Sequence, residues 1–188
     1  MPKPLSDLND LISHIVTYNS ETAYKQLFKS LFPLVYRFSY CLLRCREQAE
    51  EVASDVLITI WRNRHKLLEI QNIKVYAFVI ARNLSLNILS KNLNRKFVSL
   101  DDIEVDLVIS SMNPEQILIN EELKDKLEEA TQTLPSRCKL VFKLIKEDGL
   151  SYKETAAILN ISTKTVDAHL VTAVKKLTAI LQVEFKLS

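Results

Sequence analysis

The stretch ISTKTVDAHLVTAVKKL, residues 161–177, decides how the end of this 188-residue chain folds. At about 100° per residue, apolar side chains recur along one side of a helix, and polar or small side chains occupy the other sides. The pattern predicts a helix over 163–184 with a buried stripe and an exposed face. The predicted buried stripe holds Val166, Leu170, Val174, Leu177 and Leu181.

The residues before this helix predict a sharp turn and a second, shorter helix. Ser162 is a typical N-cap, and Ile161 suits a hydrophobic staple. In SYKETAAILN, residues 151–160, the S-x-x-E pattern is a capping box, and Asn160 tolerates the left-handed conformation of a turn. Two helices joined in this way are typical of a helix-turn-helix, whose second helix enters the major groove of DNA. An ordinary helical hairpin with a solvated face remains the alternative reading of these residues.

The composition predicts an all-α protein without a bound nucleotide. Gly149 is the single glycine, which leaves no phosphate-cradling loop and argues against a sheet-and-turn architecture. No uncharged apolar run of about 18 residues exists to cross a membrane. The opening residues MPKPLSDLND lack the apolar core of a secretory signal, so the chain is expected in the cytoplasm, without membrane insertion.

The cysteines and histidines form no catalytic or metal-binding pattern. An odd, small number of cysteines suits a reducing compartment. Cys41 and Cys45 stand four apart with no histidine nearby, so they are expected to be buried small apolar residues and not metal ligands. His14, His65 and His169 lie in unrelated segments, and no nucleophile elbow or H-E-x-x-H is present. The chain is therefore predicted not to be an enzyme, and to need no cofactor and no small-molecule substrate.

The net charge of +2 hides an uneven distribution. Residues 1–96 hold 14 Lys and Arg against 8 Asp and Glu, whereas residues 97–120 hold five acids and no base. Residues 121–188 are nearly neutral, with 11 bases and 10 acids. We therefore predict a helical domain over 1–96, an acidic linker over 97–113 and a second helical domain over 114–188 that ends in the helix-turn-helix.

Capping and breaking residues predict four helices in each domain. In the second domain Asn113-Pro114 opens the first helix, and Pro135 separates it from the next. Pro33 is expected to kink or divide the second helix of the first domain. The expected helices are 5–17, 21–45, 47–64 and 72–94 in the first domain, and 114–132, 136–147, 152–159 and 163–184 in the second.

Two helices of the first domain have a distinctive second face. In the third, a core stripe of Ala49, Val52, Val56 and Ile60 leaves an exposed Ile58 between carboxylates, which suits either a protein-binding surface or a solvated face. In the fourth, amide side chains precede a cluster of lysine and arginine, which suits nucleic acid or simply a solvated helix end. The polar stripe of the fourth helix holds Tyr76, Asn83, Asn87 and Ser90, and the cluster holds Lys91, Arg95 and Lys96.

Four blocks follow one another along the chain. They are AEEVASDVLITIWRNR, VYAFVIARNLSLNIL, an acidic linker with NPEQ, and LPSRCKLVFKLIKEDGLSYKETAAILNISTKTVDAHLVTAVKKL. In this order and spacing they resemble bacterial sigma factors of the extracytoplasmic-function (ECF) group, the smallest members of the sigma-70 family. The resemblance extends from about Ala23 to Leu181.

This resemblance implies a promoter-specificity subunit that binds core RNA polymerase and promoter DNA, and that commonly has an anti-sigma factor as a further partner. The first domain resembles conserved region 2, which recognises and opens the minus-ten element. The second resembles region 4, which reads the minus-thirty-five element, and the linker resembles the segment that threads the polymerase. A helix-turn-helix regulator that does not join polymerase is the alternative, although it would leave the first domain and the linker without a role.

The resemblance, together with the polar and basic helix faces described above, gives the expected site residues. Polymerase docking falls on Glu51, Ser54, Asp55, Ile58 and Arg62. Minus-ten contacts fall on Tyr76, Asn83, Asn87, Lys91, Arg95, Lys96 and the loop at 65–74. Minus-thirty-five contacts fall on Lys164, Thr165, Asp167, Ala168, His169, Thr172, Lys175 and Lys176. The chain departs from the family where Asn87 and Ser90 replace the common Asp and Arg, which weakens phosphate attraction there.

Overall fold

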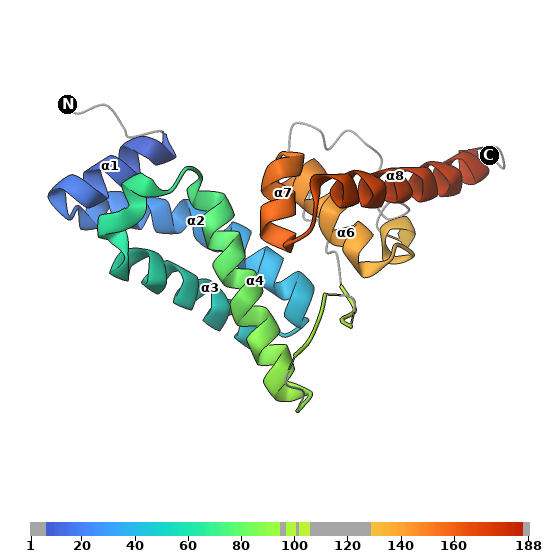
Figure 1. The fold of residues 1–188 in the computed structure, drawn as a ribbon, viewed down its shortest axis with the longest axis horizontal. Coiled ribbons are helices and arrows are strands. Elements are labelled where there is room, and N and C mark those ends of the chain that lie inside the picture. Colours follow the sequence, from blue (N-terminus) through green and yellow to red (C-terminus); the bar gives the residue numbers. More distant parts are fainter. Residues whose placement is uncertain (1–6, 95–96, 101, 106–128, 186–188) are drawn as a thin grey trace. The chain divides into compact units, whose positions relative to one another are not determined.

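The computed structural model describes residues 7–94, 97–100, 102–105 and 129–185. All regular secondary structure in these residues is helical (Figure 1), which confirms the all-α prediction. The chain divides into two compact units, Met1–Lys96 and Phe97–Ser188. Each unit is described by itself below.

The first unit is a helical bundle in which α2 contacts each of the other α-helices. Side chains cap the helix starts, as when Ser20 Oγ accepts from the backbone N–H of Ala23 and Asn72 Oδ1 accepts from that of Lys74. The elements are α1 (Leu8–Tyr18), α2 (Glu21–Leu43), α3 (Arg46–Arg62), the 3₁₀-helix η1 (Arg64–Glu69) and α4 (Ile73–Asn92).

The core of the first unit lies between α2, α3 and α4. Phe38 of α2 and Phe78 of α4 meet edge to face, with ring centroids 5.0 Å apart, an arrangement that aromatic pairs favour. The α3 stripe predicted from the sequence is confirmed, because all four of its members are buried. The other fully buried large side chains of these helices include Leu27, Leu31, Leu42, Leu57 and Ile60.

Of the two predicted effects of Pro33 the structure excludes one, and one predicted loop is shorter than expected. Pro33 does not divide α2, which runs through it without interruption. Pro33 is exposed, so water can hydrate the carbonyl that loses its helical donor. The predicted loop at 65–74 is largely structured, because η1 takes up residues 64–69 and only 70–72 separate it from α4.

Cys45 is not the buried apolar residue that its spacing from Cys41 predicted. It is the half-buried N-cap of α3, and its thiol donates to Glu47 Oε2 at 3.1 Å. The hydrogen bond from the backbone of Glu47 lowers the pKa of that carboxyl, and the Cys45 thiol adds to the effect. Cys41, in contrast, is buried as expected.

The second unit contains the helix-turn-helix. Residues 129–132 are helical; α6 (Ser136–Phe142) continues into the π-helix η3 (Lys143–Glu147) and is followed by α7 (Tyr152–Leu159) and α8 (Thr163–Phe185). Of the predicted helix 114–132, residues 114–128 lie outside the described residues. The buried cluster between the helices consists of Ala130, Leu134, Cys138, Ala173 and Leu177.

The turn signals of the helix-turn-helix are confirmed. Ser151 and Glu154 form the reciprocal capping box of α7. Asn160 adopts the left-handed conformation at φ 56° and ψ 49°, and the backbone N–H of Ile161 reaches the carbonyl of Ala156, as in a Schellman closure. Ser162 Oγ accepts from the backbone N–H of Thr165 at 3.0 Å and so caps α8.

The predicted buried stripe of α8 was wrong at one position. Val166, Leu170 and Leu177 are buried, but Val174 is 42% exposed. Ala173, fully buried, takes its place. At 100° per residue Ala173 lies about 20° from Val166 on the helix and Val174 about 80° away, so position on the helix outweighs side-chain size here. The side chain of Leu181 lies outside the described residues.

The described part of the predicted linker packs within the second unit. Its apolar side chains Val98, Leu100, Ile103 and Val105 are buried. Ser136 Oγ of α6 donates to the carbonyl of Ile103 at 2.7 Å. By its contacts this segment groups with the second unit and not with the first.

Candidate nucleic-acid and protein interfaces

One side of α3 is exposed, with two carboxylates in its N-terminal half and an arginine at its C-terminal end. Glu51, Asp55 and Arg62 are exposed, Ser54 is half-buried, and Ile58 is 44% exposed. The core stripe lies on the opposite side of the helix, so the structure brings all five predicted polymerase-docking residues to one face. An exposed isoleucine between Asp55 and Arg62 offers a partner both apolar contact and charge.

An aromatic row runs along α2 and contacts α3 through Tyr24, and it was not predicted from the sequence. Tyr24 packs on Trp61 of α3, with ring centroids 4.7 Å apart, and its hydroxyl donates to the carbonyl of Leu57. The Arg64 guanidinium lies over the same Trp61 ring, 4.6 Å from its centroid. Spacing by four residues could have revealed the row, which consists of Tyr24, Phe28, Phe32, Tyr36 and Tyr40.

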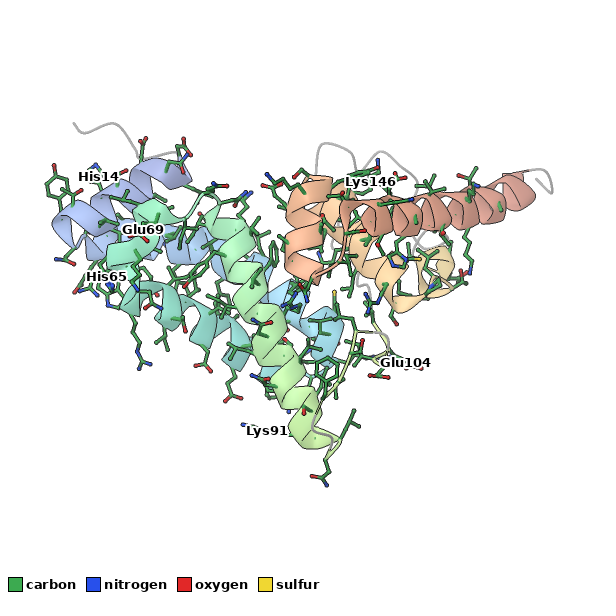
Figure 2. All side chains as sticks on the ribbon, in the orientation of Figure 1. His14, His65, Glu69, Lys91, Glu104 and Lys146 are labelled. Carbon is green, nitrogen blue, oxygen red and sulfur yellow. The ribbon has the colours of Figure 1, made fainter. Side chains whose placement is uncertain are left out.

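The predicted minus-ten residues of α4 share one polar face. Asn83 and Asn87 are exposed, and Tyr76 and Ser90 are half-buried. Figure 2 shows Lys91 at the C-terminal end of the helix, where it is exposed. The remaining two members of the basic cluster, Arg95 and Lys96, lie outside the described residues.

Asn83 is oriented by its neighbour Arg82. The guanidinium donates from Nε and Nη2 to Asn83 Oδ1, at 3.2 and 2.8 Å. Burial lowers the pKa of Arg82, although the group stays charged at any physiological pH. Because Asn83 Oδ1 already accepts twice, the Asn83 amide presents its N–H donors, which suit the acceptor atoms of a base.

The predicted recognition face of α8 is exposed over its first four turns. Thr165 is half-buried, and its hydroxyl pairs with that of Ser162 at 2.7 Å. The Thr172 hydroxyl donates to the carbonyl of Ala168, which leaves its methyl group and its two oxygen lone pairs for a ligand. The exposed members of the set are Lys164, Asp167, Ala168, Thr172, Lys175 and Lys176.

Two residues of α8 differ from the sequence-based prediction in how exposed they are. Val171, which was not assigned a role, is 43% exposed beside Thr172 and could contact a thymine methyl group. His169 is half-buried, with Nδ1 3.6 Å from Cys138 Sγ. Burial raises the pKa of Cys138, against a smaller opposite effect of Lys176, so the thiol remains protonated at neutral pH.

These cysteine environments predict unequal reactivity. We expect iodoacetamide to alkylate Cys45 at least about tenfold faster than Cys138 at mildly alkaline pH, because only a thiolate with access to solvent reacts. Peptide mass spectrometry at timed quenches measures both rates. Alkylation in denaturant is the control and should equalise them, and equal rates in the native chain would contradict the burial of Cys138.

Neither a metal centre nor a membrane span is found in the described part of the chain. No group of three or more His, Cys, Asp or Glu side chains there could hold a metal ion. No helix there is both long enough and apolar enough to cross a membrane.

Family models match both units. The model described as "Sigma-70 region 2" matches residues 27–95, which include the exposed faces of α3 and α4. The model described as "Sigma-70, region 4" matches residues 124–177, which include the helix-turn-helix. The chain belongs to the sigma-70 family. The two matched regions of this sigma-70 chain carry the exposed helix faces described above, so the predicted family is confirmed.

Individual relatives agree with this assignment. The ECF RNA polymerase sigma factor SigE of Mycolicibacterium smegmatis is 26% identical over 141 residues, which are 72% of this chain and 52% of that protein. The sigma-70 chain thus spans about half the length of that curated relative, which belongs to the ECF group predicted from the sequence. Two solved structures share the fold of this chain, each at a TM-score of 0.55. The CnrH–CnrY complex matches at 19% identity over 94% of this chain and 99% of the matched chain. The RpoE–NepR complex from Bartonella quintana matches at 21% identity over 85% of this chain and 97% of the matched chain.

Proposed function

We propose that this sigma-70 chain binds core RNA polymerase and directs it to a specific set of promoters. The observation that carries the proposal is the presence of both family regions in one chain, each with its binding face exposed. The proposed location is the cytoplasm, where polymerase and promoter DNA are found. The proposal includes an anti-sigma partner, because RpoE, a protein of the same fold, forms a complex with the anti-sigma factor NepR.

In this proposal the two units have different binding roles. The acidic α3 face docks on polymerase, and the α4 face with its amides contacts the minus-ten strand. The start of α8 enters the major groove at the minus-thirty-five element, as the second helix of this motif does. Residues 1–96, 97–113 and 114–188 are the proposed region 2 domain, linker and region 4 domain.

The decisive experiment is reconstituted transcription. The purified chain is mixed with core polymerase and a library of promoter-length duplexes, and run-off transcripts are sequenced. We expect transcripts that start at one shared promoter motif and that require the chain. Transcripts without a shared motif, or no stable complex with core polymerase, would overturn the proposal.

The α4 face leads to a prediction about strand opening. Asn83→Ala should lower transcription from a duplex promoter by about five- to thirtyfold, because it removes one or two hydrogen bonds of about 1 kcal/mol each. On a template whose minus-ten region is already mismatched, the loss should be smaller. Run-off assays on both templates measure this, with Asn9→Ala, an exposed asparagine of α1, as the control. An equal loss on both templates would assign Asn83 to base capture instead.

The α8 face leads to a prediction that separates base reading from phosphate binding. Asp167 can accept from a cytosine amino group, and such a contact discriminates between bases by about 1–3 kcal/mol. Lys176 lies further along the helix and can reach phosphates, which carry no sequence information. Asp167→Ala should therefore change the preferred upstream motif, and Lys176→Ala should weaken binding to all sequences alike.

Selection from a promoter library and a salt titration measure the two effects. The slope of log affinity against log salt should fall by about 1 for Lys176→Ala and stay unchanged for Asp167→Ala. The two variants act as controls for each other. An unchanged upstream motif with Asp167→Ala would exclude Asp167 as a base reader.

A further inference from the structure

Arg64, the first residue of η1, joins the end of α1 to the end of α3. Its Nε donates to Asn19 Oδ1 at 2.8 Å, and its Nη1 donates to the carbonyl of Trp61 at 3.1 Å. The guanidinium also lies over the Trp61 ring, a position in which an aromatic face attracts a cation. The Arg64 side chain is half-buried. Arg64 is therefore a clamp between two elements, with Asn19 at one end and Trp61 at the other.

The end of α1 provides the acceptor for this clamp. Asn19 is the C-cap of α1 and adopts the left-handed conformation, at φ 49° and ψ 35°. Asparagine and glycine both tolerate this conformation, so a glycine could end α1 in the same way. What asparagine adds at this position is the amide oxygen that accepts from Arg64.

The clamp stands at the start of the loop that the family resemblance assigns to the minus-ten strand. The first part of this loop is η1, which packs against α1. Leu67 of η1 is 1% exposed and anchors it in the core. A 3₁₀-helix has poorer hydrogen-bond geometry than an α-helix, so the position of η1 depends on the tertiary contacts of Leu67 and Arg64. The exposed side chains of η1 are His65, Lys66, Leu68 and Glu69, of which His65 and Glu69 are labelled in Figure 2.

We propose that Arg64 is a positioning residue, which holds η1 and residues 70–72 in the arrangement that contacts the opened minus-ten strand. Two of its nitrogens donate within the protein, and its guanidinium lies on the Trp61 ring. Arg64 therefore acts through the exposed side chains of η1 and not as a phosphate ligand. The contact between these side chains and the strand rests on the proposed function, whereas the clamp is a property of the free chain.

Hydrogen exchange in the full-length free chain tests the clamp. Asn19→Gly keeps the left-handed turn but removes the acceptor, and Arg64→Lys keeps the charge but removes the planar fork of donors. We expect the amides of 65–72 to exchange at least about threefold faster in each variant, because η1 loses a hydrogen bond made by a charged group. The control is Asn94→Gly, at another exposed left-handed asparagine, which should leave this exchange unchanged.

The double variant shows whether both changes act through the same contact. It should exchange no faster at 65–72 than Arg64→Lys alone, since effects that share one interaction do not add. Additive effects, or unchanged exchange in Asn19→Gly, would overturn the clamp. If α3 and α4 also exchange faster in Arg64→Lys, Asn19→Gly, which retains Arg64 and Trp61, decides the question.

Transcription with core polymerase tests the positioning role. We expect Asn19→Gly and Arg64→Lys to lower transcription from a duplex promoter by at least about threefold, with the affinity for core polymerase within about twofold of wild type. This difference distinguishes a displaced η1 from a misfolded first unit, which would lose polymerase affinity as well. Arg46→Lys, at an exposed arginine of α3, is the control and should transcribe like the wild type.

The remaining outcomes separate the clamp from the proposed function. Full transcription in Asn19→Gly with a loss in Arg64→Lys would make Arg64 a direct DNA contact and overturn the positioning role. Full transcription in both variants, or a parallel loss of polymerase affinity, would overturn it too. A wild-type chain that gives no promoter-specific transcripts would overturn the proposed function and leave the clamp, as measured by hydrogen exchange, established.

Discussion

Reversing Glu51 and Asp55 to lysine is expected to lower the affinity for core polymerase by at least about 100-fold while the helical content is retained. Both carboxylates are exposed on α3, so the substitutions remove no buried contact. At a complementary interface, placing like charges together costs several kcal/mol, and each 1.4 kcal/mol is about tenfold in affinity. Titration of labelled chain with core polymerase measures the loss, and circular dichroism measures the helices.

The control is a second double reversal with the same change in net charge. Asp10 and Glu21 are exposed acids in the first turns of α1 and α2 and lie outside the proposed docking face. Their change to lysine should leave the affinity within about threefold of wild type, since single rim charges act mainly on association rates. Undiminished binding by the Glu51 and Asp55 variant would remove this face from the interface.

Truncating Lys143 is expected to destabilise the second unit by about 3–5 kcal/mol, the usual cost of breaking a buried ion pair from one side. Lys143 is 2% exposed. Its ammonium lies 3.3 Å from the carboxylate of Glu147 and 3.2 Å from that of Asp148. Lys143→Ala therefore leaves the largely buried carboxylate of Asp148 without this cation and also opens a cavity.

Urea unfolding followed by two probes distinguishes the stability of the second unit from that of the first. Trp61 is the single tryptophan and lies in the first unit, so its fluorescence should keep the wild-type midpoint. The second unit should unfold at lower urea when it is followed by circular dichroism. Lys146→Ala, at an exposed lysine of the same π-helix, is the control and should change the stability by less than about 0.5 kcal/mol. A wild-type midpoint for Lys143→Ala would contradict the role of the ion pair.

Local signals in the sequence predicted most of the helix-turn-helix. The cap at Ser151 and the turn at Asn160 depend on residues only a few positions apart, so the sequence contains all of the information that they require. The exposed face of α3 was also predicted, because a helix with one buried stripe must expose the opposite side. The same reasoning failed on α8, where it favoured a valine at 174 over the smaller Ala173.

The buried lysines could not be predicted in the same way. Lys139 and Lys143 would be read from sequence as surface residues, since lysine is almost never buried without a partner. One partner of Lys139 is the carbonyl of Val105, 34 residues away in the sequence. The carboxylates that pair with Lys143 are brought to it by a π-helical turn. The burial of Val98, Leu100, Ile103 and Val105 was missed for a related reason, because an irregular segment that packs through tertiary contacts has no helical period.

The π-helix η3 holds one more residue than an ordinary helical turn. The backbone N–H of Asp148 reaches the carbonyl of Lys143, five residues back, whereas an α-helix closes over four. Losing one residue from 144–147 would restore an ordinary turn and place the aspartate four positions after Lys143, where helical side chains are still neighbours. Homologous chains can therefore carry this stretch with or without the extra residue and keep the ion pair.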